Sequence, residues 1–301
     1  METLIEKIER LKKEKNAIIL AHFYVEPEVQ KIADYIGDSF YLAKVAKQTH
    51  SDTIVFCGVE FMGESAKILN PEKTVLMPDT KADCPMAHMA TVEKVLEMKE
   101  KYDDLAVVCY INSSAKLKAV STVCVTSANA QKIVEALPNK NIFFIPDKNL
   151  GGYIARNTNK NVILNDGFCP IHNQISVDDI KNAKMAYPNT QILMHPECQK
   201  EVLEYADYIG STSGIIKYAT QSDCKEFIIV TEIGVLYELQ NKNPNKTFHF
   251  TAPMPICVDM KKITLEKIAD CLENGNGEVK IDKDIMAKAL VPLEKMLELA
   301  K

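Results

Sequence analysis

The amino-acid sequence predicts an α/β fold in which one unit of about 85 residues is used three times. Cys84, Cys169 and Cys257 lie 85 and 88 residues apart. An offset of 173 residues carries Cys84 onto Cys257, and it also carries segment 33–37 onto segment 206–210, which has the identical sequence Ala-Asp-Tyr-Ile-Gly. In every copy, strand patterns alternate with helix patterns, which is typical of parallel sheets covered by helices on both faces.

Polar residues before each cysteine keep the same register in the three copies. The offset of 173 pairs the first copy with the third, and an offset of 88 pairs it with a middle copy that contracts by three residues before its cysteine. The matching positions are His22, Tyr110 and His195; Tyr24, Asn112 and Glu197; and Ser39, Ser127 and Thr212. We therefore expect three αβα repeats, residues 1–85, 86–170 and 171–258, and a helical tail, residues 259–301, that packs on the body.

Size and composition are those of a globular enzyme. The chain has 301 residues, which exceeds the usual size of a single core, and its charged and hydrophobic fractions of 26% and 47% are ordinary. A net charge of -5 without a basic stripe argues against nucleic acid as a partner. The N-terminal segment lacks the apolar core of a signal peptide, and no apolar run is long enough to span a membrane. We expect a cytoplasmic protein with no membrane partner.

The order of elements can be predicted within each repeat. After an amphipathic helix in residues 1–15, we expect first strands at 17–21, 105–111 and 191–194, each followed by a helix and a short apolar piece that ends in Ser39, Ser127 or Thr212. Each hydroxyl precedes a helical pattern, so all three residues are expected to be helix N-caps. Third strands are expected at 53–56, 141–145 and 226–230, last strands at 74–77, 161–164 and 247–250, and tail helices at 264–272 and 282–299.

Each cysteine of the repeat follows the last strand of its unit. In parallel sheets, ligands bind outside the carboxyl ends of the strands. If the units meet around an approximate threefold axis, Cys84, Cys169 and Cys257 converge at one point. The chain has nine cysteines, and this odd number indicates a reducing compartment rather than a disulfide framework.

Three converging thiolates fit a 4Fe-4S cluster that keeps one iron without a protein ligand, because such clusters are held by cysteine and normally take four. The free iron would act as a Lewis acid. Zinc held by three sulfurs and a water is the competing metal site. Three buried thiols without a metal are a further alternative, although the matching register of the three copies argues against it. No Cys-x-x-Cys pair is present to indicate a zinc ribbon or an electron-transfer ferredoxin.

The polar residues at the strand ends suit a small polyanionic ligand. At helix starts, hydroxyls and backbone N–H groups bind carboxylate or phosphate. His22 and His195 are candidate acid-base groups or charge partners of such a ligand, with hydrogen-bonded core histidines as the alternative. Tyr24, Tyr110 and Glu197 add proton donors and acceptors at the same strand ends.

Longer motifs run through nearly the whole chain. They are Ala21-His22-Phe23-Tyr24, Gly37-Asp38-Ser39, Asp83-Cys84-Pro85-Met86-Ala87, Tyr110-Ile111-Asn112, Thr126-Ser127-Ala128-Asn129, Pro146-Asp147-Lys148-Asn149-Leu150-Gly151, Gly167-Phe168-Cys169-Pro170-Ile171-His172, His195-Pro196-Glu197-Cys198, Gly210-Ser211-Thr212-Ser213-Gly214, Thr231-Glu232-Ile233-Gly234 and Cys257-Val258-Asp259-Met260-Lys261. This combination closely resembles the quinolinate synthase family, the A-type iron-sulfur enzymes of bacterial and archaeal NAD biosynthesis.

The resemblance implies three Rossmann-like three-layer αβα domains in a pseudo-threefold arrangement. It implies one 4Fe-4S cluster at the centre, held by Cys84, Cys169 and Cys257. It also implies the reaction: iminoaspartate condenses with dihydroxyacetone phosphate, phosphate and water leave, and the ring closes and aromatises to quinolinate. The open iron would help to expel the last hydroxyl as water, and a functional link to the enzyme that produces iminoaspartate is implied as well.

The same resemblance implies roles for single residues. The groups that would hold substrate carboxylates and phosphate are Tyr110, Asn112 and Ser127. His22 and Ser39 would help to seat the triose. The acid-base positions would be Tyr24 with Thr212, and Glu197 with His195 and His172. Of these, Thr212, His195 and Glu197 would also contact substrate.

Two residues depart from the family pattern. Phe23 stands where a second tyrosine is usual, and we expect it to point into the sheet at little cost. Asp259 stands where asparagine is usual and adds a negative charge near the cluster. Two other functions stay open: an iron-sulfur hydro-lyase of another carboxylic acid, and an iron-sulfur redox sensor. A sensor would not need the ring of histidine, tyrosine, glutamate and hydroxyl side chains.

Overall fold

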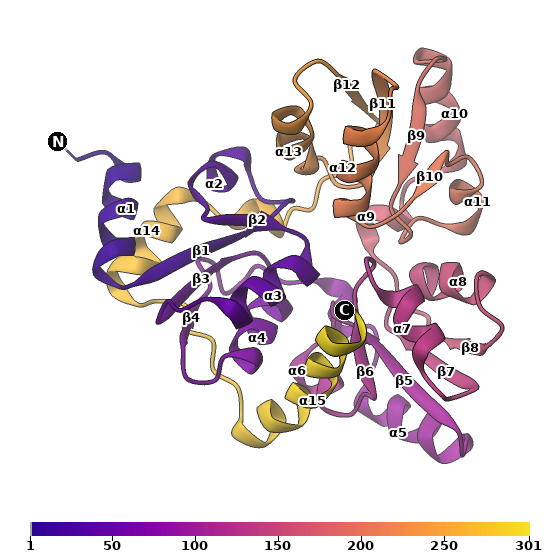
Figure 1. Ribbon diagram of the computed structural model, residues 1–301, viewed down its shortest axis with the longest axis horizontal. Coiled ribbons are helices and arrows are strands. Elements are labelled where there is room, and N and C mark those ends of the chain that lie inside the picture. Colours follow the sequence, from indigo (N-terminus) through magenta and orange to yellow (C-terminus); the bar gives the residue numbers. More distant parts are fainter. Residues whose placement is uncertain (1) are drawn as a thin grey trace.

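Three four-stranded sheets, all parallel, are arranged around a common centre (Figure 1). The computed structural model describes residues 2–301. In each sheet the first strand of the repeat is central, the second strand lies on one side of it, and the third and fourth strands follow on the other side. The α/β fold of three similar domains, predicted from the repeat, is therefore confirmed.

The three repeats contain the same succession of elements. The first has α1 Leu4–Glu14, β1 Ala17–His22, α2 Pro27–Ile32, β2 Tyr35–Gly37, α3 Ser39–Gln48, β3 Thr53–Cys57, α4 Glu60–Leu69, β4 Thr74–Leu76 and the 3-10 helix η1 Pro85–His88. The second has α5 Val92–Lys101, β5 Leu105–Tyr110, α6 Ala115–Ala119, β6 Val123–Val125, α7 Ala130–Ala136, β7 Asn141–Ile145, α8 Lys148–Arg156, β8 Asn161–Leu164 and α9 Pro170–Asn173. The third has α10 Val177–Ala186, β9 Gln191–Met194, α11 Lys200–Leu203, β10 Tyr208–Ile209, α12 Thr212–Gln221, β11 Glu226–Val230, α13 Val235–Lys242, β12 Thr247–Phe250 and η2 Met260–Lys262.

The predicted strands agree with the observed ones to within one residue at each end. Each sheet lies inside one of the predicted repeats, while the boundaries at residues 85, 170 and 258 stay predictions. Each repeat ends in a short helical turn that begins at, or shortly after, its cysteine. The three cysteines follow the carboxyl ends of the last strands β4, β8 and β12, and they line one cavity.

Alternating side chains cover both faces of the third sheet. Along β11, Phe227 and Ile229 belong to one apolar cluster, and Ile228 and Val230 belong to the other. Phe23, from the first repeat, is buried in the first of these clusters. It therefore packs against the third domain, and the prediction that it would point into its own sheet was wrong. Phe23 lies beyond the end of β1, where the chain turns toward the neighbouring domain.

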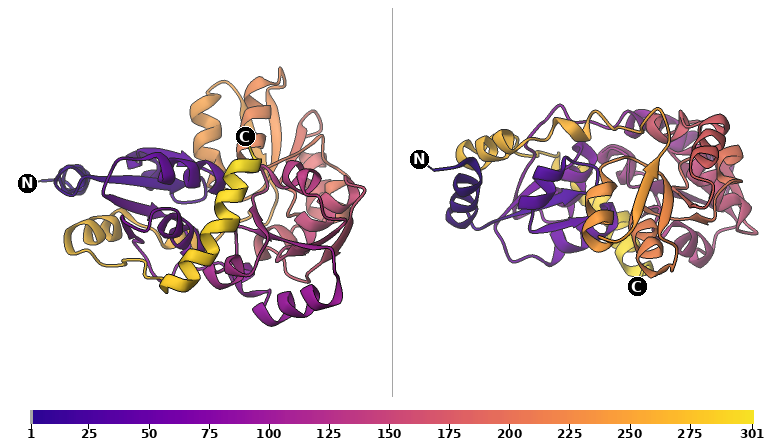
Figure 2. Two further views of the ribbon diagram at one scale, coloured as in Figure 1. Left: turned by 60° about the horizontal axis from the view of Figure 1, so that its bottom comes forward. Right: turned by 90° about the horizontal axis from the view of Figure 1, so that it is seen from above.

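The tail consists of α14 Leu265–Asn274 and α15 Lys283–Leu299. α14 packs on α1, and α15 packs on α4, α6 and β6, so α15 joins the first and second domains (Figure 2). Between the two helices, Glu278 makes an antiparallel bridge with Leu76 of β4. Gly277 next to it has φ +78° and would place a Cβ 2.0 Å from the Met77 carbonyl oxygen, so only glycine fits there.

Hydrophobic residues of the first domain, the second domain and the tail form one continuous core. Local capping starts the outer helices: Thr3 and Glu6 form a capping box at α1, and Ser176 and Asp179 form another at α10. No helix within residues 2–301 has both the length and the hydropathy to cross a membrane.

Candidate active site

A cavity of about 190 Å³ lies where the strand ends of the three domains meet. All of the site residues predicted from the sequence line it. They are His22, Tyr24, Ser39, Cys84, Tyr110, Asn112, Ser127, Cys169, His172, His195, Glu197, Thr212 and Cys257. The fold thus gathers in one place a set of residues spread over more than 230 positions of sequence.

The three cysteines of the repeat differ from most of the other six. Cys84, Cys169 and Cys257 are half-buried and face the cavity, whereas five of the others are buried in the cores. Cys84 occupies the N-cap position of η1 and Cys169 that of α9, so their sulfurs lie near the first backbone N–H groups of the following turn. Amide dipoles in this arrangement favour the thiolate, which is the form that binds metal.

Burial opposes the thiolate form in the absence of a metal. It raises the pKa of Cys84, Cys169 and Cys257. The charge of Glu197 raises the pKa of Cys84 and Cys169 further, and the thiolates also repel one another. A positively charged metal centre removes both penalties, because the protons leave when it binds.

The spacing of the three sulfurs bears on which metal they suit. The sulfurs of Cys84, Cys169 and Cys257 do not all lie within 4.8 Å of one another. Three sulfurs on one zinc ion, at about 2.3 Å each, could be no more than about 4.6 Å apart. This geometry suits a cluster in which each sulfur binds a different iron.

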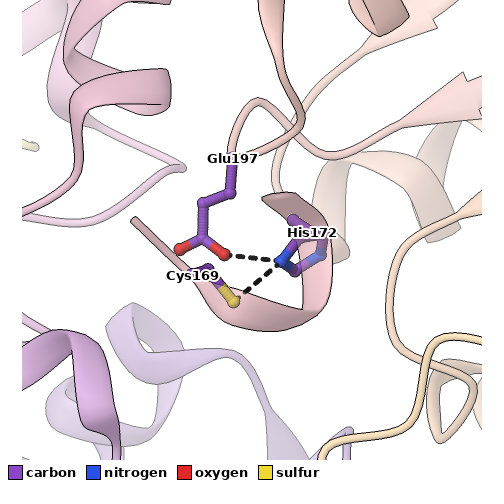
Figure 3. A group of neighbouring side chains, drawn as sticks. All are labelled: Cys169, His172 and Glu197. Carbon is purple, nitrogen blue, oxygen red and sulfur yellow. Dashed lines mark hydrogen bonds and ion pairs between the residues drawn. The ribbon is translucent and has the colours of Figure 1, made fainter. Parts of the chain in front are cut away.

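Cys169, His172 and Glu197 do lie within 4.8 Å of one another (Figure 3). His172 Nδ1 is 2.8 Å from Glu197 Oε2 and 3.2 Å from Cys169 Sγ. His172 and Glu197 are buried, and the His172 ring stacks on that of His195 with centroids 4.7 Å apart. The three side chains thus already satisfy one another by hydrogen bonds.

The first and third repeats present their histidines in the same way. The Tyr24 N–H donates to His22 Nδ1 at 3.2 Å, and the Glu197 N–H donates to His195 Nδ1 at 3.4 Å. Both rings therefore accept at Nδ1 and carry the proton of the neutral form at Nε2. Burial lowers the pKa of His22 and of His195 to about 3, so both are neutral at pH 7. His195 Nε2 lies 3.1 Å from Ser127 Oγ and donates to it.

A chain of hydrogen bonds connects the first domain with the third. The Tyr24 hydroxyl lies 2.8 Å from Thr212 Oγ1 and 2.7 Å from Thr231 Oγ1. Thr231 Oγ1 in turn lies 2.9 Å from His172 Nε2, and His172 reaches Glu197. Protons can be exchanged along such a chain because each hydroxyl both donates and accepts.

Glu197 is the charged centre of this network. Burial raises its pKa, but electrostatic interactions with the His195 and His172 side chains and hydrogen bonds from His172 and Tyr110 outweigh burial and lower the pKa to about 2. Burial together with the Glu197 charge raises the pKa of Tyr110, and burial raises that of Tyr24. At neutral pH the cavity wall therefore carries the ionised Glu197 together with two phenols that keep their protons.

The prediction that Ser39, Ser127 and Thr212 are helix N-caps was wrong. Asp38 caps α3 and Ser211 caps α12, so Ser39 and Thr212 are the first residues inside these helices. Ser127 lies two residues before Asn129, the N-cap of α7. The side chains of Asp38 and Ser211 accept capping hydrogen bonds, whereas that of Asn129 makes none, and all three predicted hydroxyl residues line the cavity.

Two polar atoms at the cavity have no hydrogen-bond partner within residues 2–301. They are Asn112 Oδ1 and Thr126 Oγ1, and both are buried. Buried polar atoms are normally paired, so unpaired atoms on a cavity wall indicate a site for a polar ligand. Sequence reasoning identified Asn112 but did not assign a role to Thr126.

Asp259, one of the two departures, has a structural role. Its Oδ1 accepts the Asp83 N–H at 3.2 Å and pairs with Lys262 Nζ at 2.6 Å. The added negative charge is thus matched by a neighbouring lysine. Sequence reasoning also gave no role to Thr231, Asp147 or Glu232, which are fully buried around the site; only their places in the quoted motifs pointed to them.

Comparisons with known proteins identify the family of this chain. A family described as Quinolinate synthetase A protein matches residues 6–298. The quinolinate synthase of Fusobacterium nucleatum is 56% identical over 296 residues, which cover 98% of this chain and 99% of that protein. The quinolinate synthase of Clostridioides difficile is 54% identical over 299 residues (99% and 98%), and that of Aquifex aeolicus is 48% identical over 303 residues (99% and 94%). This chain therefore belongs to the quinolinate synthetase A family of enzymes.

Proposed function

We propose that the central cavity is where this chain condenses iminoaspartate with dihydroxyacetone phosphate to quinolinate, with release of phosphate and water. The family consists of quinolinate synthases of NAD biosynthesis and implies iron-sulfur chemistry. The observation that carries the proposal is the meeting of three half-buried cysteines, one from each repeat, with a buried acid-base network at one cavity. The odd number of cysteines supports the cytoplasm as the compartment.

Cys84, Cys169 and Cys257 would hold a 4Fe-4S cluster. Their number leaves one iron without a protein ligand, and their spacing suits several irons better than one zinc ion. When bound, such a cluster supplies a Lewis acid that can stabilise negative charge on a substrate oxygen. The other steps of recognition and proton transfer are assigned to side chains and backbone groups of the chain.

Neutral donors would hold the anionic groups of the substrates. Ser39 and Thr212 begin helices of ten residues, so their hydroxyls and the first backbone N–H groups lie at the positive ends of helix dipoles. Asn112 faces the cavity with a buried, unpaired Oδ1 that can accept from a substrate hydroxyl or N–H, and Ser127 offers a hydroxyl that lies 3.1 Å from His195 Nε2. Neutral donors suit this cavity because Glu197 is itself charged.

The hydrogen-bonded network would move protons during condensation and dehydration. Tyr24 keeps its proton at neutral pH and can donate it, while Thr231 and His172 link its hydroxyl to Glu197. Glu197 is ionised and lies 2.8 Å from His172 Nδ1, so it can exchange a proton with the network through His172. The neutral His22 would direct its Nε2–H group at a substrate oxygen, and His195 would act on the substrate together with Ser127, to which its Nε2–H donates.

Two alternatives are separated from this proposal by one experiment. The chain is purified without oxygen, iron and sulfide are counted, and quinolinate is measured after addition of dihydroxyacetone phosphate and freshly generated iminoaspartate. About four irons per chain with quinolinate formed supports the proposal. Four irons without quinolinate favours a hydro-lyase of another acid or a redox sensor, and zinc in place of iron refutes the cluster.

The three cysteines are tested one at a time by Cys84→Ala, Cys169→Ala and Cys257→Ala. Each variant should lose both iron and activity. Cys57→Ala is the control, because Cys57 is fully buried in β3 away from the cavity and should retain both. Full activity in an iron-free Cys84→Ala protein would overturn the proposal. Coupling to the enzyme that supplies iminoaspartate is part of the same proposal, because this substrate is unstable in water.

A further inference from the structure

Each cysteine at the cavity gives its backbone N–H to a carboxylate. The Cys84 N–H donates to Asp83 Oδ1 at 2.7 Å. The Cys169 N–H donates to Asp147 Oδ2 at 3.1 Å, and the Cys257 N–H donates to Glu232 Oε1 at 3.1 Å. We call Asp83, Asp147 and Glu232 the carboxylate clamps.

Two of the clamps occupy the same place in the repeat. Asp147 is the second residue after β7, and Glu232 is the second residue after β11. The matching residue after β3 is Val59, which cannot accept a hydrogen bond through its side chain. In the first repeat, Asp83 supplies the carboxylate instead, from the position directly before Cys84.

Asp147 and Glu232 each bind two segments at once. The other oxygen of Asp147 accepts the Leu150 N–H at 2.7 Å and caps α8, and the other oxygen of Glu232 accepts the Gly234 N–H at 2.6 Å. Both residues are fully buried. Burying a carboxylate is costly unless it is well hydrogen-bonded, so the two-sided arrangement offsets a substantial cost at both positions.

Glu232 also links the site to the first domain. It pairs with Lys261 Nζ at 3.0 Å, and the same ammonium group donates to the Tyr24 carbonyl oxygen at 2.7 Å. The Cys257 loop is therefore fixed, through one carboxylate and one lysine, to the segment that carries the Tyr24 hydroxyl.

We propose that Asp147 and Glu232 are positioning residues that hold the Cys169 and Cys257 loops in the geometry that retains the cluster. The inference rests on the proposed function, since it takes these cysteines as cluster ligands. Ligands of a metal centre are oriented by their hydrogen-bonded neighbours, and loss of such a neighbour typically costs about 10- to 100-fold in metal affinity or activity. The clamps act on the backbone of the ligand residues and leave the sulfurs free.

Asp147→Asn tests the clamp without removing the helix cap. Asparagine is a good N-cap, so its single oxygen can still accept the Leu150 N–H, but its NH₂ group then faces the Cys169 N–H. Asp104→Asn is the matched control: Asp104 also accepts two N–H groups, from Lys140 and Asn139, at the opposite edge of the same sheet. This control makes the same chemical change far from the cysteines.

Wild type and both variants are purified without oxygen and reconstituted with iron and sulfide. Iron release to an excess of chelator is followed by absorbance, the reduced cluster is examined by electron paramagnetic resonance, and unfolding temperatures are measured. We expect Asp147→Asn to release iron about ten times faster than wild type and to show an altered spectrum, while Asp104→Asn matches wild type in both. Release from Asp147→Asn at the rate of Asp104→Asn would refute the clamp.

Glu232→Gln provides a second test if Asp147→Asn does not fold. Its amide can keep the Gly234 contact and loses an acceptor toward Cys257, so iron release should again be about ten times faster. Cys169→Ala separates the two proposals. If it binds as much iron as wild type, the cysteine assignment fails; if it loses iron while both clamp variants retain it normally, only the clamps are wrong.

Discussion

The hydroxyl of Tyr24 lies 2.8 Å from Thr212 Oγ1, although the two residues are 188 positions apart and belong to different domains. Tyr24 follows the end of the first strand of its repeat, and Thr212 is the first residue of a helix in the third repeat. Their contact shows that the first and third domains build one network and not two separate sites. The same hydroxyl reaches Thr231, and through it His172 and Glu197.

Tyr24→Phe should reduce quinolinate formation about 100-fold or more. The substitution removes a proton donor while the ring keeps its packing, and general acid catalysis contributes about 10²- to 10⁴-fold. Steady-state rates and iron content are measured together. Tyr41→Phe, at a partly exposed tyrosine of α3, is the control and should behave as wild type. A Tyr24→Phe enzyme with a normal rate would remove Tyr24 from the proton network.

Thr231→Val tests whether the Thr231 hydroxyl, and not only the volume of its side chain, is needed between Tyr24 and His172. Valine has the shape of threonine but cannot bridge Tyr24 and His172, and leaving buried polar groups unpaired costs about 1–3 kcal/mol. The rate constant kcat should fall and the unfolding free energy should decrease. Thr231→Ser restores the hydroxyl, so it should recover most of kcat. Equal rates for the valine and serine variants would show that the hydroxyl has no role in the reaction.

The fold was largely predictable because its signal was repeated three times. Strand positions, the parallel sheets and the convergence of Cys84, Cys169 and Cys257 followed from matched register. The N-cap predictions for Ser39, Ser127 and Thr212 were wrong because Asp38, Asn129 and Ser211 stand beside them, and a hydroxyl pattern does not decide which of several adjacent polar residues caps a helix.

Other parts of the site could not be found by aligning the repeats. Thr231 contacts groups from both the first and second repeats, and its role exists only once the domains are assembled. Phe23 packs on the third domain for the same reason. In the first repeat, the position that matches Asp147 and Glu232 is Val59, and Asp83 accepts the cysteine N–H instead. Aligning the three copies therefore does not reveal this carboxylate.

Asp259→Asn should retain iron and activity. Its amide oxygen can still accept the Asp83 N–H, and only the pairing with the partly exposed Lys262 is lost. Asp259→Ala removes both contacts and should speed iron release, because Asp83 holds the Cys84 loop. Iron release to a chelator compares the two variants. Faster release from the asparagine variant than from the alanine variant would contradict this role of Asp259.

The buried His22 should make stability depend on pH in the acid range. Its pKa is lowered by burial to about 3, whereas that of an unfolded histidine is about 6.5. Below pH 6.5 the unfolded chain binds a proton that the folded chain does not, so this contribution to stability is full above pH 6.5 and is lost as the pH falls toward 3. The loss is about 1.4 kcal/mol per pH unit for one such group.

His22→Asn should therefore make the pH dependence shallower. Unfolding free energies of the cluster-loaded protein are measured by denaturant at about pH 6.5, 5.5 and 4.5. This range begins at the pKa of the unfolded histidine and extends below it, where the unfolded chain binds the proton. The slope of the variant should be smaller than that of wild type by up to about 1.4 kcal/mol per pH unit. His50→Asn, at an exposed histidine, should leave the slope unchanged. If His22→Asn keeps the full slope, the ring takes up its proton as readily in the folded state as in the unfolded chain, and burial does not keep His22 neutral in the acid range.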